Sequence, residues 1–198
     1  MPVKQPKLES RNSRGELRRL RILDAAQRVF SLAGFRGATM EAIALEARMA
    51  KATVYSYFPD KDAMFRAVVE RIALQMADMV EKAVAGARTP AEGIVAAILA
   101  KEEMAYRIVR ASPHSRDLLE SSERLVAEEV FATVERRKLN ALAKALEKMH
   151  VEKPKEAARL IAAAAAGAAA MASSAEDLAA NLDRVVRACL KGWSRRSD

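Results

Sequence analysis

The chain has 198 residues, 51% of them hydrophobic, which suits one or two small domains with a sizeable core and excludes a disordered chain. A single cysteine, Cys189, excludes an intramolecular disulfide and fits a reducing compartment. The basic N-terminus has no apolar stretch behind it, and the alanine-rich stretch 157–172 is too weakly hydrophobic to span a bilayer, so we expect a soluble cytoplasmic protein.

Positive charge is concentrated in the first third of the chain. The net charge is +8, from 34 Lys and Arg against 26 Asp and Glu. Residues 1–58 hold 11 basic and 5 acidic residues, whereas the other 140 residues hold 23 and 21. A localised basic region is expected of a protein that binds a polyphosphate, although a solvated basic tail is the alternative.

The composition predicts an all-α fold of about nine helices, because helix-forming residues dominate while Gly (7) and Pro (6) are scarce. We expect an N-terminal three-helix helix-turn-helix domain followed by a C-terminal helical bundle. The expected division is a flexible basic arm over residues 1–13, the helix-turn-helix domain over residues 14–60, and the bundle over residues 61–198.

The first three helices carry the helix-turn-helix pattern. A helix over about 14–33 is ended by Gly34 in a left-handed conformation. Thr39 caps a second helix over about 40–47, and Pro59 ends a third over about 51–58. The third helix is short and rich in polar side chains that gain nothing from burial, which favours a nucleic-acid groove as their partner.

The remaining helices are predicted from their capping residues. Asp60 caps a long helix to about residue 85, and Thr89 with Pro90 and Glu92 starts a helix to about residue 110. Ser112 and Pro113 start a short sixth helix. The last three predicted helices cover about 121–149, starting at Ser121 or Ser122, then about 156–172 after a loop containing Pro154, and about 175–193, capped by Ser174 and Asp177.

Many positions of residues 16–70 resemble, in order, the DNA-binding domain of the TetR/AcrR family of bacterial transcription regulators. The resemblance is specific because it covers a long ordered pattern and not one short motif. It rests on Ile22-Leu23-Asp24-Ala25-Ala26, Phe30, Gly34-Phe35-Arg36-Gly37-Ala38-Thr39-Met40, Ile43-Ala44, Ala47 and Lys51-Ala52-Thr53-Val54-Tyr55-Ser56-Tyr57-Phe58-Pro59-Asp60-Lys61-Asp62-Ala63-Met64-Phe65.

By this resemblance the third helix is the recognition helix. Val54 and Phe58 lie four residues apart and should pack inward. That leaves Lys51, Ala52, Ser56 and Tyr57 toward the groove, with Thr53 and Tyr55 near its walls. The resemblance implies that Tyr55 donates to a phosphate and that Lys61 pairs with one. Thr39 either holds a phosphate at a helix N-terminus or is a plain cap. The expected DNA-binding residues are Thr39, Arg48, Lys51, Ala52, Thr53, Tyr55, Ser56, Tyr57 and Lys61.

Two residues of the turn depart from the family pattern. Arg48 stands where glycine is usual, and a left-handed backbone at arginine costs about 1 kcal/mol. The turn either relaxes, or Arg48 reaches a phosphate as compensation. Ala50 stands where a serine cap is usual and loses about 1 kcal/mol of capping.

The C-terminal domain is expected to bind an effector and to form a homodimer. Flexible Met side chains and Phe131 suit an adaptable ligand pocket, against the alternative of ordinary core packing. The alanine-rich helix permits close approach of a partner helix, as the resemblance also implies. The pocket residues are Met76, Met79, Met104, Phe131 and Met149, and the interface residues are Ala162, Ala165, Ala166, Ala169, Leu178, Leu182, Val185 and Val186.

The function expected from the sequence is a transcriptional repressor. A homodimer binds a palindromic operator in double-stranded DNA and dissociates when an unknown small-molecule effector binds. The alternative is a nucleoid or protein-binding factor on the same fold, which a closed, densely packed C-terminal core would favour. We expect no enzyme, cofactor or metal, since His114 and His150 lack partner ligands at metal-binding spacing and no nucleophile motif is present.

Overall fold

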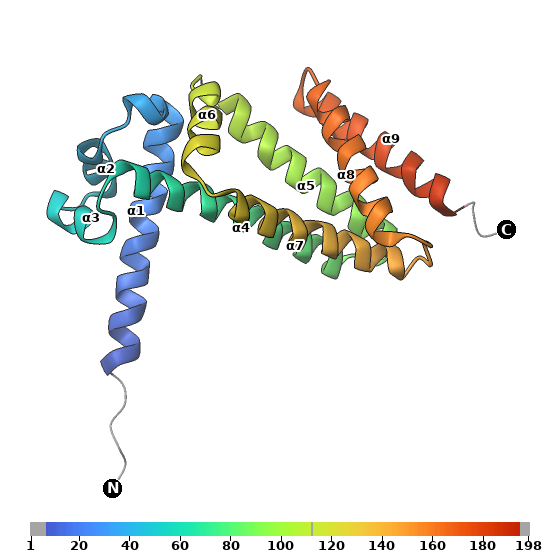
Figure 1. Cartoon of the computed structure of the whole chain (residues 1–198), viewed down its shortest axis with the longest axis horizontal. Coiled ribbons are helices and arrows are strands. Elements are labelled where there is room, and N and C mark those ends of the chain that lie inside the picture. The colour runs from blue at the N-terminus through green and yellow to red at the C-terminus, as the bar shows by residue number, and fades with distance from the viewer. Residues whose placement is uncertain (1–6, 112, 195–198) are drawn as a thin grey trace, which may run out of the picture. The chain divides into compact units, whose positions relative to one another are not determined.

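A computed structural model describes residues 7–111 and 113–194 of the chain. Within these residues it contains nine helices and no strand, which confirms the predicted all-α fold (Figure 1). No described helix is both long and apolar enough to cross a membrane. The helices are α1 (Lys7–Gly37), α2 (Met40–Ala47), α3 (Lys51–Tyr57), α4 (Lys61–Gly86), α5 (Pro90–Ala111), α6 (Ser115–Leu125), α7 (Glu128–Glu147), α8 (Pro154–Ala170) and α9 (Ala175–Ser194).

The chain forms two compact units. The N-terminal unit comprises Met1–Arg71 and Ala111–Val126, and the C-terminal unit comprises Ile72–Arg110 and Ala127–Asp198. The first eleven residues of α4 and the whole of α6 therefore group with the helix-turn-helix, although the sequence assigned them to the C-terminal domain. The reason is local packing, since α6 lies against α1, and α4 starts directly after the helix-turn-helix.

The first helix starts earlier than the sequence indicated. It begins at Lys7, because residues 7–13 contain neither glycine nor proline to stop it. The predicted flexible arm, residues 1–13, thus includes helical residues, and its first six residues lie outside the described part of the chain. At the other end Gly34 has the predicted positive φ of 70°, but its ψ of 178° kinks the helix, which continues to Gly37.

Three phenylalanines form the aromatic centre of the N-terminal unit. Phe30 of α1 and Phe35 stack with ring centroids 6.2 Å apart, and Phe65 of α4 contacts each of them edge-on at 5.0 Å. All three side chains are buried. Such edge-to-face pairs add to the stabilisation from buried apolar area, so this cluster ties the start of α4 to the end of α1.

The boundaries of α2 and α3 agree with the sequence prediction to within one residue. The Thr39 hydroxyl accepts a hydrogen bond from the Ala42 N–H at 3.1 Å, as a capping residue should. Asp60 and Thr89 cap α4 and α5 in the same way, accepting from Ala63 and Glu92.

The boundary between α6 and α7 was predicted wrongly. Ser121 and Ser122 were expected to start the seventh helix, but both lie inside α6, where the Ser122 hydroxyl donates to the Leu118 carbonyl at 2.9 Å. A serine that bonds back to its own helix does not cap the next one. Helix α7 starts at Glu128, after two residues with extended backbone.

Two loop positions next to α8 also differ from expectation. Pro154, predicted to lie in a loop, occupies the first turn of α8, where its missing N–H costs nothing. His150 has a φ of 57° and ends α7, with its N–H and that of Val151 donating to carbonyls of Glu147 and Leu146. This is a Schellman arrangement, and the buried Val151 supplies its apolar contact.

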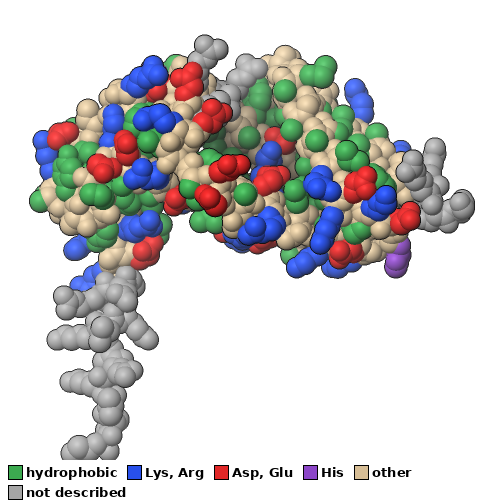
Figure 2. All heavy atoms as spheres, viewed as in Figure 1, with side chains coloured by type: hydrophobic (Ala, Val, Ile, Leu, Met, Phe, Trp, Pro, Cys, Tyr) green, Lys and Arg blue, Asp and Glu red, His purple; other side chains and the backbone are tan. Residues whose placement is uncertain are grey.

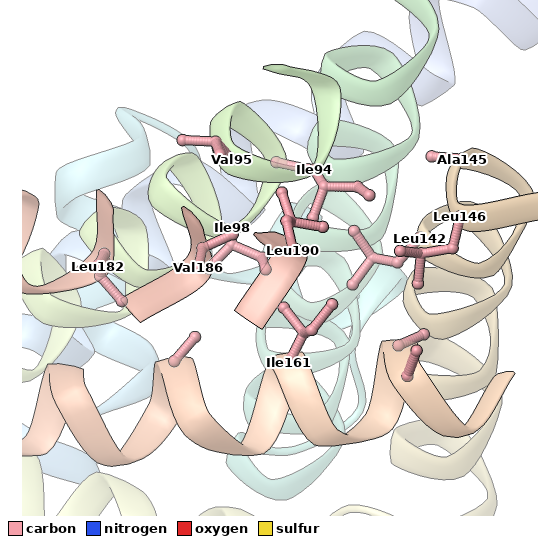
Figure 3. Packing of buried hydrophobic residues seen from close by; sticks show 14 of the residues in the cluster. Ile94, Val95, Ile98, Leu142, Ala145, Leu146, Ile161, Leu182, Val186 and Leu190 are labelled. Atoms are coloured by element: carbon pink, nitrogen blue, oxygen red, sulfur yellow. The ribbon is translucent and has the colours of Figure 1, made fainter. Parts of the chain in front are cut away.

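The main apolar core of the C-terminal unit combines residues of α4, α5, α7, α8 and α9, and a smaller cluster joins Ala73 and Ala77 of α4 to Val134 of α7. Figure 3 shows Ile94 and Ile98 of α5, Ile161 of α8 and Val186 of α9 pointing into a common interior. Helix α8 packs between α7 and α9. The predicted cap of α9 is present, because the Asp177 N–H donates to the Ser174 hydroxyl at 3.0 Å while the Asp177 carboxylate accepts from the Ser173 N–H at 2.9 Å. The hydrogen bonds that the Asp177 carboxylate accepts lower the pKa of Asp177, chiefly the one from the Ser173 N–H.

Gly34→Ala should destabilise the chain by about 1–3 kcal/mol. A Cβ at Gly34 would lie 2.6 Å from Asp117 Oδ2 and 3.0 Å from the Cβ of His114, at a positive φ that side chains avoid. Urea unfolding of both proteins measures the difference. Gly37→Ala is the matched control, because its Cβ would meet only Ala33 at an ordinary 3.5 Å. Equal stability of the two variants would contradict the tight packing of α6 against Gly34.

Candidate functional site

Helix α3 is held by two buried side chains on its inner face. Val54 is fully buried and Phe58, directly after the helix, is 4% exposed. The Arg19 guanidinium lies 5.5 Å from the centroid of the Phe58 ring, a cation–π contact that links α3 to α1. The opposite face of α3 presents Lys51, Ala52, Tyr55 and Ser56 to solvent.

The turn between α2 and α3 keeps its left-handed geometry. Arg48 has φ 54° and ψ 47°, so the turn does not relax to accommodate the side chain. The N–H groups of Arg48 and Met49 donate to the carbonyls of Leu45 and Ala44, both at 3.0 Å, in a Schellman arrangement. Ala50 precedes α3 without a side-chain cap, and the Arg48 side chain is exposed.

Lys51 is paired within the helix-turn-helix. Its ammonium lies 3.3 Å from the Glu41 carboxylate of α2, and both side chains are more than half exposed. The pKa of Glu41 is lowered, first by a hydrogen bond from its own backbone N–H and then by Lys51. Glu41 is therefore ionised at neutral pH and competes with any anion that approaches Lys51.

The two tyrosines of α3 lie in different environments. Tyr55 is 44% exposed, whereas Tyr57 is half-buried with its hydroxyl near Gly15 of α1. Thr53 is half-buried, and its carbonyl accepts a hydrogen bond from the Ser56 hydroxyl at 2.7 Å. Because the Ser56 hydroxyl already donates its proton, it can only accept a hydrogen bond from a group in the groove.

Lys61 binds the backbone of its own unit. Its ammonium donates to the carbonyls of Phe35 at 2.9 Å and Ala38 at 3.1 Å, and lies 4.6 Å from the Phe35 ring centroid. These contacts link the first residue of α4 to the segment between α1 and α2. The family resemblance implied that Lys61 binds a phosphate, and the structure adds a role in holding this segment. Thr39, which caps α2, is exposed beside it.

Basic side chains do not form an unbroken field on the face seen in Figure 2, where Lys and Arg are interspersed with Asp and Glu. Several pairs account for this in the N-terminal unit. Arg28 contacts Glu46 at 2.6 Å, and Arg71 contacts Asp24 at 2.7 Å. The exposed residues of the turn and of α3 are therefore more informative about binding than the net charge.

The C-terminal unit contains a cavity of about 270 Å³ between α4, α5, α7 and α8. The five residues proposed from the sequence for a ligand pocket lie elsewhere, outside its lining: Met76, Met79, Met104 and Met149 are half-buried and Phe131 is 38% exposed. The lining residues are Val80, Ala97, Ile98, Lys101, Glu102, Glu135, Lys138, Leu139, Leu142, Arg159, Ala162, Ala163, Ala165 and Ala166.

The residues proposed for a dimer interface are largely occupied within the chain itself. Four are buried in the core of the C-terminal unit, namely Ala165, Leu178, Leu182 and Val186. Ala162, Ala165 and Ala166 line the cavity, and Ala169 and Val185 are half-buried. The large apolar side chains that α8 and its end leave exposed are Leu160, at 53%, and Met171, at 83%.

Sequence reasoning missed the residues that partner Lys51 and line the cavity. Glu41 stands ten residues before Lys51, too far for a helical pair, and only the turn brings the two together. The charged pair Lys101 and Glu102 interrupts an otherwise apolar stretch of α5, and Arg159 is isolated among alanines. Charged residues isolated in apolar stretches were therefore the sequence signal that could have indicated the cavity.

The helix-turn-helix region is similar to one family of known proteins. Residues 22–68 match the family model for "Bacterial regulatory proteins, tetR family". The HTH-type transcriptional regulator UidR of Escherichia coli (strain K12) is 38% identical over 76 residues, which are 38% of this chain and 35% of UidR. The match thus spans about a third of that relative's length.

Solved structures extend the similarity of fold to most of the chain. A putative TetR-family transcriptional regulator from Mesorhizobium loti has a TM-score of 0.69 at 22% identity, over 90% of this chain and 98% of that one. SmeT, the repressor of the Stenotrophomonas maltophilia multidrug efflux pump SmeDEF, has a TM-score of 0.65 at 24% identity, over 90% and 91%. SmeT has also been solved as a complex with triclosan.

Glu41→Gln should strengthen binding to duplex DNA by up to about fivefold, because an exposed ion pair of up to about 1 kcal/mol no longer competes for Lys51. Fluorescence anisotropy with a labelled duplex measures the affinity. Glu46→Gln is the matched control, since it removes the same charge from α2 but frees Arg28 instead of Lys51. Equal gains in both variants would mean that only the total charge matters.

Proposed function

We propose that this chain is a DNA-binding transcriptional regulator of the tetR family, on the premise of its similarity to that family over residues 22–68 and to UidR over 76 residues. More specifically, we propose that it is a repressor. A homodimer occupies a palindromic operator and leaves it when a small molecule binds in the C-terminal unit.

The observation that carries the DNA-binding proposal is the outer face of α3. Val54 and Phe58 take up the inner face, and Lys51, Tyr55 and Ser56 remain exposed on a helix that the turn projects outward. A short helix with one buried and one polar face is the form that enters a major groove. The basic excess of residues 1–58 supports the same proposal.

Roles for the individual residues follow from their chemistry. Lys51, an exposed lysine at the first residue of α3, is proposed to read a base edge, with Ala52, Thr53 and Ser56 beside it. Tyr55, Tyr57 and Arg48 are proposed to contact phosphates, because their donors lie on or near the exposed face. Thr39, exposed at the N-terminus of α2, is proposed to hold a further phosphate. Lys61 contributes by fixing the backbone just before Thr39.

The cavity of about 270 Å³ supports a ligand-responsive regulator over the alternative of a nucleoid or protein-binding factor. A closed core would have favoured the alternative. SmeT, which has a similar fold, binds triclosan. Helix α4 contributes residues to both units, so a ligand beside Val80 acts on a helix that begins at the DNA-binding unit. Such a ligand changes DNA affinity only if it prefers one conformation of the chain.

A homodimer is proposed through α8 and α9. Of the predicted interface residues, Ala162, Ala169 and Val185 are half-buried and Ala166 is exposed, and the large apolar side chains exposed on α8 and at its end are Leu160 and Met171. Exposed apolar side chains beside small ones favour a helix-to-helix contact. Two copies related by a two-fold axis would present two α3 helices to half-sites about one helical turn, or a multiple of it, apart.

Selection of bound sequences from random duplex DNA tests the DNA-binding proposal. The wild type should select a palindrome and lose affinity steeply with salt. Lys51→Ala should relax the preference at one base pair per half-site, at a cost of about 1–3 kcal/mol, whereas Tyr55→Phe should weaken all sequences alike. Lys82→Ala, an exposed lysine of the C-terminal unit, should change neither. An unchanged selected sequence for Lys51→Ala removes Lys51 from the base contacts, and a wild type that selects nothing refutes the regulator.

Leu160→Arg should convert the dimer to a soluble monomer, because a charge replaces an exposed apolar side chain that the single chain does not need for its core. Specific DNA affinity should then fall at least tenfold through loss of the second half-site. Sedimentation at micromolar concentration gives the oligomeric state. Leu32→Arg, 76% exposed on α1, is the matched control and should remain dimeric. A monomeric wild type with tight operator binding would overturn the two-fold mechanism.

A further inference from the structure

The cavity of the C-terminal unit has an apolar wall and a charged one. Ile98 of α5 and Leu139 and Leu142 of α7 form the apolar side, together with alanines of α8. The cavity volume of about 270 Å³ equals that of roughly nine water molecules in the liquid. That space suits the apolar part of a ligand of about eight carbon atoms.

Both carboxylates that line the cavity already have cationic partners. The Glu102 side chain is 8% exposed, and its carboxylate lies 2.7 Å from the Lys101 ammonium. Glu135 forms an ion pair with Lys138 within α7. A cationic ligand would have to displace one of these lysines, and a buried charge that loses its partner is strongly destabilising.

Arg159 is the cation that remains available. It lines the cavity from α8, its side chain is exposed, and within the described part of the chain it forms no hydrogen bond or ion pair. A second hollow of about 370 Å³ shares Glu135, Leu139 and Arg159 with the cavity and adds Arg136 and Lys155. Lys155 lies four residues before Arg159, on the same face of α8. The adjoining hollow therefore carries three cationic side chains against one carboxylate, Glu135, which Lys138 already pairs.

We propose that this cavity binds an amphipathic organic anion, with an apolar chain or ring against α5 and α7 and a carboxylate at Arg159 and Lys155. The proposal rests on the proposed ligand-responsive function and names the chemical class of its effector. Guanidinium and carboxylate groups form paired hydrogen bonds, so Arg159 both attracts the acid group and fixes its direction. The alanines of α8 leave room for the apolar part, which a larger side chain would fill.

Three ligands of equal length test the class by isothermal titration calorimetry on the full chain without DNA. Octanoate should bind at least about tenfold more tightly than octanol, and octylammonium should bind most weakly. Tighter binding of octylammonium than of octanoate would overturn the proposal, as would equal affinity for all three. Phosphatidylglycerol vesicles distinguish a free acid from a lipid headgroup. Co-sedimentation with vesicles in the absence of octanoate binding would also overturn the proposal.

Variants locate the site. Arg159→Gln should weaken octanoate binding about tenfold and leave octanol unaffected, whereas Ala163→Phe should abolish both by filling the cavity. Arg187→Gln is the matched control, an exposed arginine of α9 that is paired with Asp183 and remote from the cavity lining. An Arg159→Gln protein that keeps its octanoate affinity would overturn the proposal even if Ala163→Phe fails to fold.

DNA titration of the same preparations separates the two proposals. Octanoate binding without DNA binding by the wild type would refute the regulator but keep the ligand class. DNA binding without octanoate binding would keep the regulator and refute the ligand class.

Discussion

The ammonium of Lys61 is the contact on which the geometry of the N-terminal unit depends. It bridges the carbonyls of Phe35 and Ala38 and lies over the Phe35 ring, which packs in turn against Phe30 and Phe65. The segment it holds ends at Thr39, the cap of α2. Since α2 carries the turn and the turn sets α3, the direction of the exposed face of α3 depends on this contact. Partial burial makes its hydrogen bonds more valuable than those of a solvated lysine.

Elements with a local signal could be predicted from the sequence. Helices α2 and α3 were placed to within one residue, because Thr39 and Pro59 act on their immediate neighbours. The caps at Thr89 and Ser174 were found for the same reason. The prediction failed at Ser121 and Ser122, which have the composition of a cap but bond within α6. The choice between these two uses of serine depends on α6 packing against α1, which no local pattern contains.

The candidate sites of the C-terminal unit could not be predicted from local sequence patterns. The cavity combines residues from four helices that are distant in the sequence, and an alanine run has no apolar periodicity to show which face turns inward. Flexibility of methionine was the sequence argument for a pocket, yet the cavity wall is built of alanine, leucine and isoleucine with charged residues at its edge. Small side chains on α8 leave space there, while Ala157, Ala158 and Ile161 on its inner face pack against the core. The same alanine-rich composition therefore serves core packing on one face and a cavity on another.

The turn between α2 and α3 keeps its geometry although it has arginine where glycine is preferred and alanine where a capping side chain is preferred. A left-handed arginine costs about 1–2 kcal/mol relative to glycine, and the missing cap at Ala50 about 1 kcal/mol more. The sum is a sizeable fraction of the 5–15 kcal/mol that stabilises an ordinary domain. The geometry persists because hydrogen bonds from Arg48 and Met49 to α2, and the burial of Val54 and Phe58, each constrain it independently. The departures at Arg48 and Ala50 therefore cost stability without changing the geometry of the turn. Because the turn keeps its geometry, the exposed Arg48 side chain that replaces glycine remains available for another use, and a phosphate contact is the use proposed for it.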